Sequence, residues 1–516
     1  MDLQTAFDST CRVLFGSGIG KLHDFEPYLK EMMMPFQVHA SALSGKGVVV
    51  SHPYYPQDAK YVSQEEIASL KFAPLNINEI KDVDSLFAAA AERAVYCGNK
   101  VFGGNFSVSE VDNCVDCSNV HFSHNVFHVK NGAYLSQVRE AENVFGMGPH
   151  PKCKFTIRSC EGIDANRCFE EYSCANISDM YYAINCIGCQ NCIFAFNLRS
   201  KKNVIGNLEL AQDKFLTLKK KLLAEMAQAL RKNKRLFSLA DIAFMGREKK
   251  DVPEETLAYD SPVPSKVEEG FRSTCRIVLG HEHHDIRKYG AGMLKRVLPI
   301  KKVKGAFGNP SYKVGLPTMR DIPADRLVSL EESKKCAQMQ ISIAQNEQPS
   351  LQQTALRASK IAYFAVEFID GQNINCTDTP DVFTGSNIYK CWDSTNSKTS
   401  AYASAAIESE YIFGGYLRML HSAFCINCFD STKLKNSFEV DSTYSSSNAY
   451  FCHNCENVQN AIFCFNAKAL NYAVLNQQVS KEEFERIRKM LLDYVNRELG
   501  EKGECGATIF CIGKGK

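Results

Sequence analysis

The chain has 516 residues, of which 45% are hydrophobic and 22 are cysteines, and its formal net charge is +2. A chain of this length and composition can bury two or more hydrophobic cores. The N-terminus shows no basic region followed by an apolar run, and no apolar stretch reaches the roughly 20 residues of a membrane helix, so we expect neither a secretory signal nor a membrane span. We therefore predict a cytoplasmic protein, or one assembled in a virion that forms in the cytoplasm, whose cysteines remain thiols or bind metal.

The first predicted unit, residues 1–95, is a leader domain of α/β type. It contains a short β-type run, Val48-Val49-Val50, and a helical stretch from Ser85 to Val95. We expect these elements to form one small domain ahead of the next unit.

Residues 96–207 carry a six-residue repeat. Nine asparagines fall in one six-residue frame, in which Gln137 fills a gap: Asn113, Asn119, Asn125, Asn131, Asn143, Asn185, Asn191, Asn197 and Asn203. A fixed short period is typical of a solenoid, in which each unit buries its inward side chains against the next. We therefore predict a β-solenoid with hydrogen-bonded asparagine ladders. The repeat leaves open the hand of the solenoid and whether one turn holds two hexads or three.

A helix and linker, residues 208–265, follow the first solenoid, with the helix running from Asp213 to about Leu236.

The same order of units then returns in the second half of the chain, which indicates a tandem duplication. Ser273-Thr-Cys-Arg repeats Ser9-Thr-Cys-Arg, and the segment 454–466 repeats the Asn-rich segment 185–197. The second half is predicted to comprise a leader α/β domain (266–362, with a helical stretch from Leu351 to Ala362), a β-solenoid (363–476), a capping helix (477–500) and a tail (501–516).

The capping helix has recognisable end signals. Ser480 is a candidate N-cap with Glu483 three residues later, and Gly500 follows the last predicted turn. An apolar stripe of Phe484, Ile487 and Leu491 can cover the open end of the solenoid. The predicted fold class is therefore mainly β with α/β parts: a duplicated β-solenoid whose halves pack as a pseudo-dimer, each with a leader domain and a trailing helix.

Several cysteines have the two-residue spacing of zinc ligands, as in Cys114/Cys117 and Cys452/Cys455. The duplicate opposes this interpretation, because Cys189 aligns with Val458 and a metal ligand cannot be exchanged for valine without loss of the ion. We expect buried core thiols, no cofactor and no metal-binding residues, with structural zinc as the alternative.

Charge distinguishes the two halves. Residues 286–320 contain nine basic residues and no acidic one. Such a run is usually a solvated face, although it can also bind an acidic protein surface or nucleic acid. The candidate anion or nucleic-acid contacts are Arg287, Lys288, Lys295, Arg296, Lys301, Lys302 and Lys304. No nucleophile elbow or His-Glu-x-x-His motif is present, so we assign no catalytic residue and do not expect an enzyme.

Two segments carry a resemblance to known proteins: the Asn-Cys-x-x-Cys units that end in Asn191-Cys-Ile-Phe-Ala-Phe-Asn-Leu-Arg-Ser-Lys-Lys-Asn203, and the segment from Leu475 to Phe484. In these segments the chain resembles a family of Cys/Asn-rich hexad-repeat solenoid proteins from reduced-genome bacteria and large tailed viruses. Members carry a Cys-x-x-Cys ribbon ahead of the solenoid, whereas this chain has only Cys11 and Cys97 there. The resemblance implies a solenoid and no enzymatic activity or substrate. We predict a structural or assembly scaffold that contacts other proteins, as part of a larger particle such as a virion. The alternatives are a zinc-binding Cys-rich protein and a nucleic-acid-associated protein that uses the run 286–320.

Overall fold

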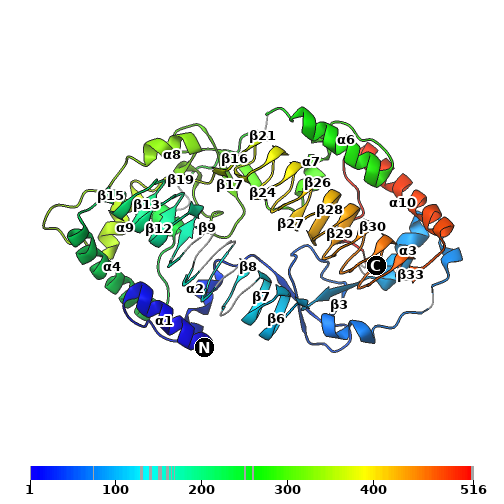
Figure 1. Ribbon diagram of the computed structural model, residues 1–516, viewed down its shortest axis with the longest axis horizontal. Helices are drawn as coiled ribbons and strands as arrows, with labels where there is room; N and C mark the ends of the chain where they lie inside the picture. The colour runs from blue at the N-terminus through cyan, green and yellow to red at the C-terminus, as the bar shows by residue number, and fades with distance from the viewer. Residues whose placement is uncertain are drawn as a thin grey trace.

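The computed structural model describes residues 2–73, 75–127, 132–138, 142–148, 154–158, 162–163, 166–167, 169–248, 252–258 and 261–512. It is a mixed α/β protein with many strands. Figure 1 shows two stacks of strands that extend in opposite directions from the middle of the molecule, with helices along their outer sides. The expected asparagine at position 131 and the end of the tail, residues 513–516, lie outside the described residues.

The first stack, built from β5–β15, contains short parallel strands. Its main pairs have partners 12 residues apart, as in Asp112↔His124 and Ser178↔Gln190. The strands are β5 (Val101–Phe102), β6 (Phe106–Val115), β7 (Ser118–Phe127), β8 (Ser136–Val138), β9 (Gly162–Ile163), β10 (Glu171–Tyr172), β11 (Cys174–Ala175), β12 (Ser178–Ile184), β13 (Gln190–Phe196), β14 (Lys202–Ile205) and the antiparallel β15 (Leu208–Glu209).

The second stack, built from β20–β33, has the same 12-residue register except in two places with an offset of 13, where Phe368 pairs with Asp381 and Glu410 pairs with Ala423. Its strands are β20 (Phe368–Asp370), β21 (Ile374–Thr377), β22 (Asp381–Phe383), β23 (Ser386–Tyr389), β24 (Ser394–Thr395), β25 (Lys398–Ala401), β26 (Glu410–Phe413), β27 (Tyr416–Arg418), β28 (Ala423–Ser431), β29 (Lys435–Asp441), β30 (Ser447–Tyr450), β31 (Gln459–Ile462), β32 (Asn471–Val474) and the antiparallel β33 (Gln477–Gln478). The repeat along both stacks is therefore two hexads long.

The backbone of each repeat bends at regular positions. In the second stack almost every third residue has positive φ, for example Asn448, Phe451, Asn454 and Asn457 at 49–54°. Asparagine tolerates this left-handed conformation better than most residues, which explains its enrichment in the repeat. The residue after each of these bends points inward and is small or apolar, as with Cys452 and Cys455, which are at most 1% exposed.

Asparagine ladders run along the stacks, as predicted. Asn185 Nδ2 donates to Asn197 Oδ1 at 3.2 Å, one repeat further on. In the second stack Asn436 donates to Asn448 at 3.3 Å, and Asn448 donates to Asn460 at 3.0 Å. Each amide thus satisfies the amide of the neighbouring repeat.

Helices flank the stacks. They are α1 (Leu3–Phe15), α2 (Glu26–Lys30), α3 (Val83–Arg93), α4 (Gln212–Asn233), α5 (Leu239–Phe244), α6 (Ser265–Leu279), α7 (Arg287–Leu294), α8 (Leu330–Cys336), α9 (Leu351–Ser359) and α10 (Lys481–Lys502). Ser480 caps α10 as expected, accepting from the Glu483 N–H. The predicted end at Gly500 is wrong: the Glu498–Lys502 ion pair at 2.8 Å lies across the last turn, and Gly503, at φ 75°, ends the helix.

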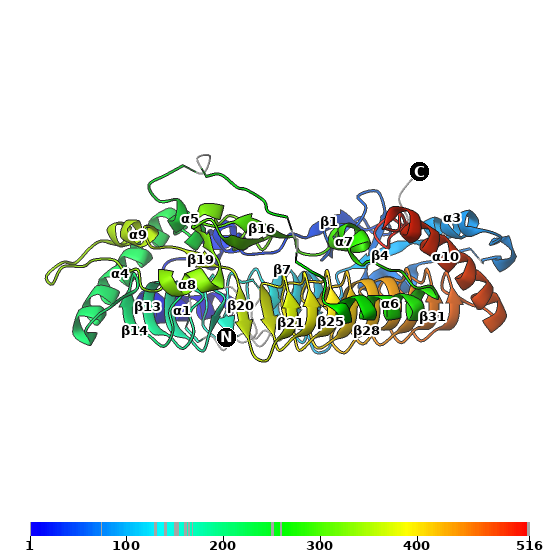
Figure 2. The ribbon, with the colours of Figure 1, turned by 90° about the horizontal axis from the view of Figure 1, so that it is seen from above.

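The leader segments are divided between two cores. Residues 3–34 pack in one core with α4, α5 and the first stack, whereas residues 48–96 pack in the other core with α6, α10 and the second stack. Conversely, α6 and α7 pack on the second stack, and residues 298–366 pack on the first. In both views α3 lies beside α10, and α8 and α9 lie near β13 (Figures 1 and 2). Each leader therefore contributes to both cores instead of forming its own.

We call residues 37–98 the first crossing segment and residues 300–365 the second. Each has an antiparallel hairpin followed by a parallel strand pair: β1 (Gln37–Ala40) with β2 (Gly47–Val50), β3 (Lys60–Ser63) with β4 (Val95–Gly98), β16 (Ile300–Lys304) with β17 (Pro310–Val314), and β18 (Leu327–Val328) with β19 (Phe364–Ala365). The two segments thus share one strand topology although they lie in opposite halves of the chain.

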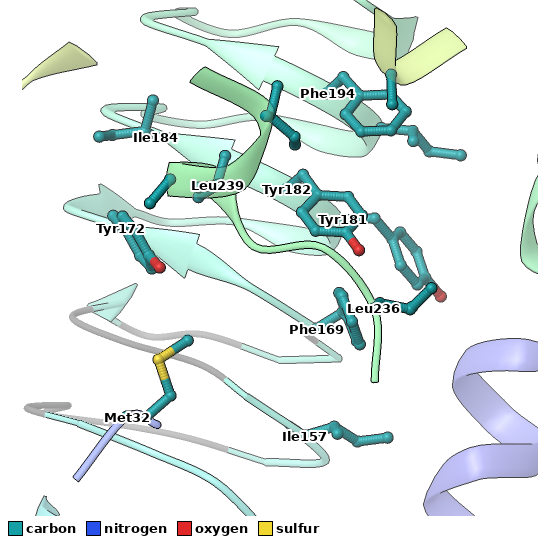
Figure 3. Close-up of a cluster of buried hydrophobic side chains, with 14 of the residues drawn as sticks. Met32, Ile157, Phe169, Tyr172, Tyr181, Tyr182, Ile184, Phe194, Leu236 and Leu239 are labelled. Carbon is teal, nitrogen blue, oxygen red and sulfur yellow. The ribbon is translucent and has the colours of Figure 1, made fainter. Parts of the chain in front are cut away.

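Buried side chains of successive repeats form columns on the outer faces of the strands. Figure 3 shows one such column in the first stack, in which Ile157, Phe169 and Tyr181 follow one another at 12-residue spacing; Tyr182 begins the neighbouring column, and Leu236 and Leu239 from the α4–α5 region lie over these side chains. The rings of Tyr182 and Phe194 stack at 5.2 Å with an interplanar angle of 5°. These columns fix how the helices attach to the stacks. No helix in the described ranges has the length and apolar character to cross a membrane.

Candidate functional site

The inward cysteines are integrated in the backbone hydrogen bonding of the stacks. Cys455 Sγ lies 3.4 Å from the His453 carbonyl oxygen and 3.3 Å from that of Cys464 in the next repeat. Ser397 Oγ donates to equivalent carbonyls, and Thr443 Oγ1 accepts from the Cys455 N–H at 3.2 Å. Cysteine, serine and threonine are therefore interchangeable at these positions, because each offers a small side chain that can both donate and accept.

Burial raises the pKa of many of the thiols that the structure describes and so favours their protonated form, whereas hydrogen bonds with Cys186 and Cys192 lower the pKa of Cys189 to about 3. Burial raises the pKa of Cys97 and of Cys391 to about 12. All described cysteines are free of disulfides, and Cys376, Cys505 and Cys511 are the less buried ones. Within the described ranges no cluster of three or more His, Cys, Asp or Glu side chains could hold a metal ion. A thiolate would be needed both for metal binding and for nucleophilic attack.

The candidate basic residues are mostly paired with local acceptors. Lys302 lies 3.5 Å from Asp378, Lys304 lies 3.1 Å from Glu255, and Lys295 lies 2.5 Å from Glu504. The other four contact further groups: Lys301 lies 3.8 Å from Glu254, Arg287 donates to the Ser261 carbonyl, Lys288 donates to the Gly500 carbonyl, and Arg296 lies over the Phe510 ring. The basic run thus forms ion pairs with Glu254 and Glu255 of the preceding linker. Counting the charges within residues 286–320 alone does not show these partners.

A buried polar cluster lies where the first crossing segment meets the second stack. His453 Nδ1 donates to Asp441 at 2.7 Å, and Tyr55 donates to the same carboxylate. The Cys97 N–H donates to His453 Nε2 at 2.9 Å, which assigns the ring proton to Nδ1. Burial disfavours the charge of Asp441, yet the hydrogen bond from His453 holds the pKa of this carboxyl below its usual value, while burial lowers the pKa of His453.

A second buried pair adjoins this cluster. Lys100 Nζ lies 2.9 Å from Asp112, and both side chains are fully buried. Ser51 Oγ and the Ser51 N–H donate to the same carboxylate at 2.6 and 2.8 Å. Burial opposes the charge of Lys100, but Asp112 raises the pKa of this ammonium group. The charges are therefore compensated locally, as a buried ion pair requires.

The cluster joins parts of the chain and does not present a reactive group. His453 has both nitrogens occupied and is completely buried, so its imidazole cannot reach a substrate. The sequence contains a signal that we missed: Asp441 and His453 interrupt a column in which Phe429 and Phe465 occupy the flanking repeats. A polar pair in an aromatic column at 12-residue spacing indicates a buried partner on the covering segment.

No known protein family, curated protein or solved structure matches this chain.

Proposed function

We propose that this chain is a non-enzymatic scaffold in which two β-solenoids with 12 residues per turn are interlocked by exchanged segments. The 12-residue register, the repeated bends with positive φ and the inward small side chains support the solenoid assignment. We infer two hexads per turn. A solenoid turn contacts only its neighbouring turns. Segments outside the repeat must therefore pack on the ends and sides of such a stack to stabilise it.

A mirrored pair of contacts carries the proposal. Asn466 Nδ2 donates to the Val95 carbonyl of the first crossing segment at 2.8 Å, and Asn197 Nδ2 donates to the Tyr363 carbonyl of the second at 2.9 Å. Next to these hydrogen bonds, two pairs of rings meet edge to face: Tyr96 with Phe465 at 5.6 Å and Phe364 with Phe196 at 5.9 Å. The same contact is thus made twice, each time between opposite halves.

This arrangement supports the tandem duplication and gives it a physical purpose. Each half completes the core of the other, so neither half can move as a separate body without exposing aromatic surface. A rigid, elongated body with repeating outer positions is suited to contacts with other proteins in a larger assembly, such as a virion or a cytoplasmic complex. The pairing of the basic run with linker carboxylates weakens the nucleic-acid alternative.

Native sizing tests the scaffold role. The chain, expressed at its natural level and released by gentle lysis, should elute well above the 57.7 kDa of one copy, whereas the purified chain should elute as a smaller species. Cross-linking before lysis should join it reproducibly to the same protein neighbours. A chain that elutes alone in both samples would contradict the proposal, as would turnover of a small molecule that one polar substitution abolishes.

A further inference from the structure

A cavity of about 130 Å³ lies beside the second stack, between α6, α7, strands β28 and β29, and residues 503–506. Glu439 and Asn427 of the stack and Tyr289 of α7 line it. The side chains of Lys295 and Glu504 line it as well and are 53% and 39% exposed, so the cavity reaches the surface at this ion pair. Its volume approaches the ~150 Å³ of a cavity that holds benzene, so it has room for a small planar group.

Glu439 is a buried carboxylate with neutral hydrogen-bond partners. Its Oε2 accepts from the Ile509 N–H at 2.9 Å and from Thr508 Oγ1 at 2.8 Å, and its Oε1 accepts from Asn427 Nδ2 at 2.9 Å. Burial raises the pKa of Glu439, and the charge of Arg296 opposes this only in part. Because a carboxylate accepts about four hydrogen bonds, Glu439 can take a further donor.

The first half shows what occupies the equivalent place. The stacked rings of Tyr182 and Phe194 correspond to the stacked rings of Phe451 and Phe463. The residues one repeat before each pair are Glu170 and Glu439, and the residues two repeats before are Arg158 and Asn427. Arg158 in the first half therefore stands where Asn427 stands in the second.

Arg158 fills its site with a guanidinium group. The group lies 4.2 Å over the ring of Tyr28, 3.1 Å from Glu31 and 3.6 Å from Glu170. The side chain is only 2% exposed. Although burial opposes the charge, Glu170 raises the pKa of Arg158. The first half thus uses a carboxylate and an aromatic face to hold a buried guanidinium.

The second half keeps the carboxylate and the ring, but Asn427 supplies no guanidinium from the position of Arg158. The spacing that relates His23-Asp24 to His284-Asp285 also relates Tyr28 to Tyr289 and Glu31 to Gly292. Asn427, which is shorter than Arg158, and Gly292, which stands in place of Glu31, both line the cavity, and Glu504 packs against Gly292. Arg296 also lines the cavity and its charge acts on Glu439, while its guanidinium carbon lies 5.9 Å from the centre of the Phe510 ring.

We propose that the cavity beside Glu439 binds a guanidinium group, supplied either by a small molecule or by an arginine side chain of a partner protein. The bound group would lie against the Tyr289 ring and pair with the Glu439 carboxylate, as the Arg158 guanidinium lies over Tyr28 and pairs with Glu170. This site goes beyond the scaffold role and does not depend on it.

Calorimetric titration of the full chain with N-methylguanidinium tests the site, and N-methylurea serves as the neutral probe of the same shape. We expect binding of N-methylguanidinium to be tighter by about tenfold or more, because only the cation gains a charge-assisted hydrogen bond. Asn427→Arg should place a tethered guanidinium in the cavity and abolish binding without lowering the thermal midpoint. Asn457→Arg, at an exposed position, is the matched control and should bind like the wild type.

Glu439→Gln provides a second variant that keeps the shape of the side chain and should also lose binding, whereas Arg296→Met should bind more tightly because a like charge is removed. Agmatine and a doubly capped arginine tripeptide distinguish the two sources. Binding of agmatine alone assigns a small molecule, and binding of both assigns a partner's arginine. Equal affinity for the cation and N-methylurea, or unchanged binding by Asn427→Arg, would overturn the proposal.

Discussion

His52 provides a direct test of the junction between the first crossing segment and the second stack. Its ring is 3% exposed and stacks on Phe510 at 4.2 Å, with Phe429 of the second stack at 5.6 Å. Neither ring nitrogen has a hydrogen-bond partner among the described residues. Burial lowers the pKa of His52 to about 3, and the nearby charge of Asp441 offsets this only partly.

The pKa gap sets the magnitude. In the unfolded chain a histidine has a pKa of about 6.5, so the unfolded state binds a proton below this pH while folded His52 stays neutral. The folded state is therefore favoured fully above pH 6.5 and loses stability as the pH falls toward 3. At pH 5, which lies about 1.5 units below the pKa of the unfolded state, the free energy of unfolding is therefore lower by roughly 2 kcal/mol.

Urea unfolding of wild type and His52→Phe at pH 7.5 and pH 5 measures this term. Phenylalanine retains the stacking on Phe510 and removes two unsatisfied nitrogens, so stability at pH 7.5 should not fall. Between the two pH values the variant should lose about 2 kcal/mol less than the wild type, since His124 and His453 contribute equally to both. His421→Gln is the matched control, because its side chain is 65% exposed. An equal loss in wild type and His52→Phe would refute the buried neutral histidine.

Three further predictions concern the stacks and their cover. Cys455→Ser should lower the free energy of unfolding by less than about 1.5 kcal/mol, because serine can make the same contacts with the two carbonyl oxygens. Cys455→Leu should lower it by roughly 1–3 kcal/mol, because the larger side chain overpacks the core. Equal losses in the two variants would contradict the inward position of residue 455. Gly98→Ala should destabilise strongly, since a Cβ there would lie 2.1 Å from the Val49 carbonyl oxygen, and Gly500→Ala, with open space around it, should not lower the thermal midpoint. Deletion of residues 479–516 should expose the last repeats and cause polymerisation in sedimentation, and a folded monomer would show that α10 is not a cap.

The repeat itself was readable from the sequence. The asparagine frame indicated ladders because stacked amides need equal spacing, and Asn185 does donate to Asn197 one 12-residue repeat away. Two hexads per repeat could not be read, since six divides both two-hexad and three-hexad turns. The exchange of Cys189 for Val458 pointed to inward packing, and both side chains are fully buried.

The exchange of crossing segments was not readable. Strands β4 and β19 place Tyr96 and Phe364 at equivalent positions, but the sequence carries no information about which stack each ring packs on. The cavity could not be predicted from the sequence either. The exchange of Arg158 for Asn427 matters only because the fold places side chains from four repeats next to α2 in one half and next to α7 in the other. Lys304 and Lys313 belong to a sequence run that has only positive charges, yet Glu255 and Glu254, which precede this run, form ion pairs with them.

Photo-cross-linking from position 87 tests the central claim, the exchange of segments between halves, most directly. The Phe87 ring of α3 lies 5.2 Å from Phe463 and 5.4 Å from Tyr494, both in the second half. With p-benzoylphenylalanine in place of Phe87, irradiation of the monomeric fraction should attach residue 87 to peptides around residues 451–463 and 494. Attachment to peptides of the first stack or of α4 would contradict the exchange.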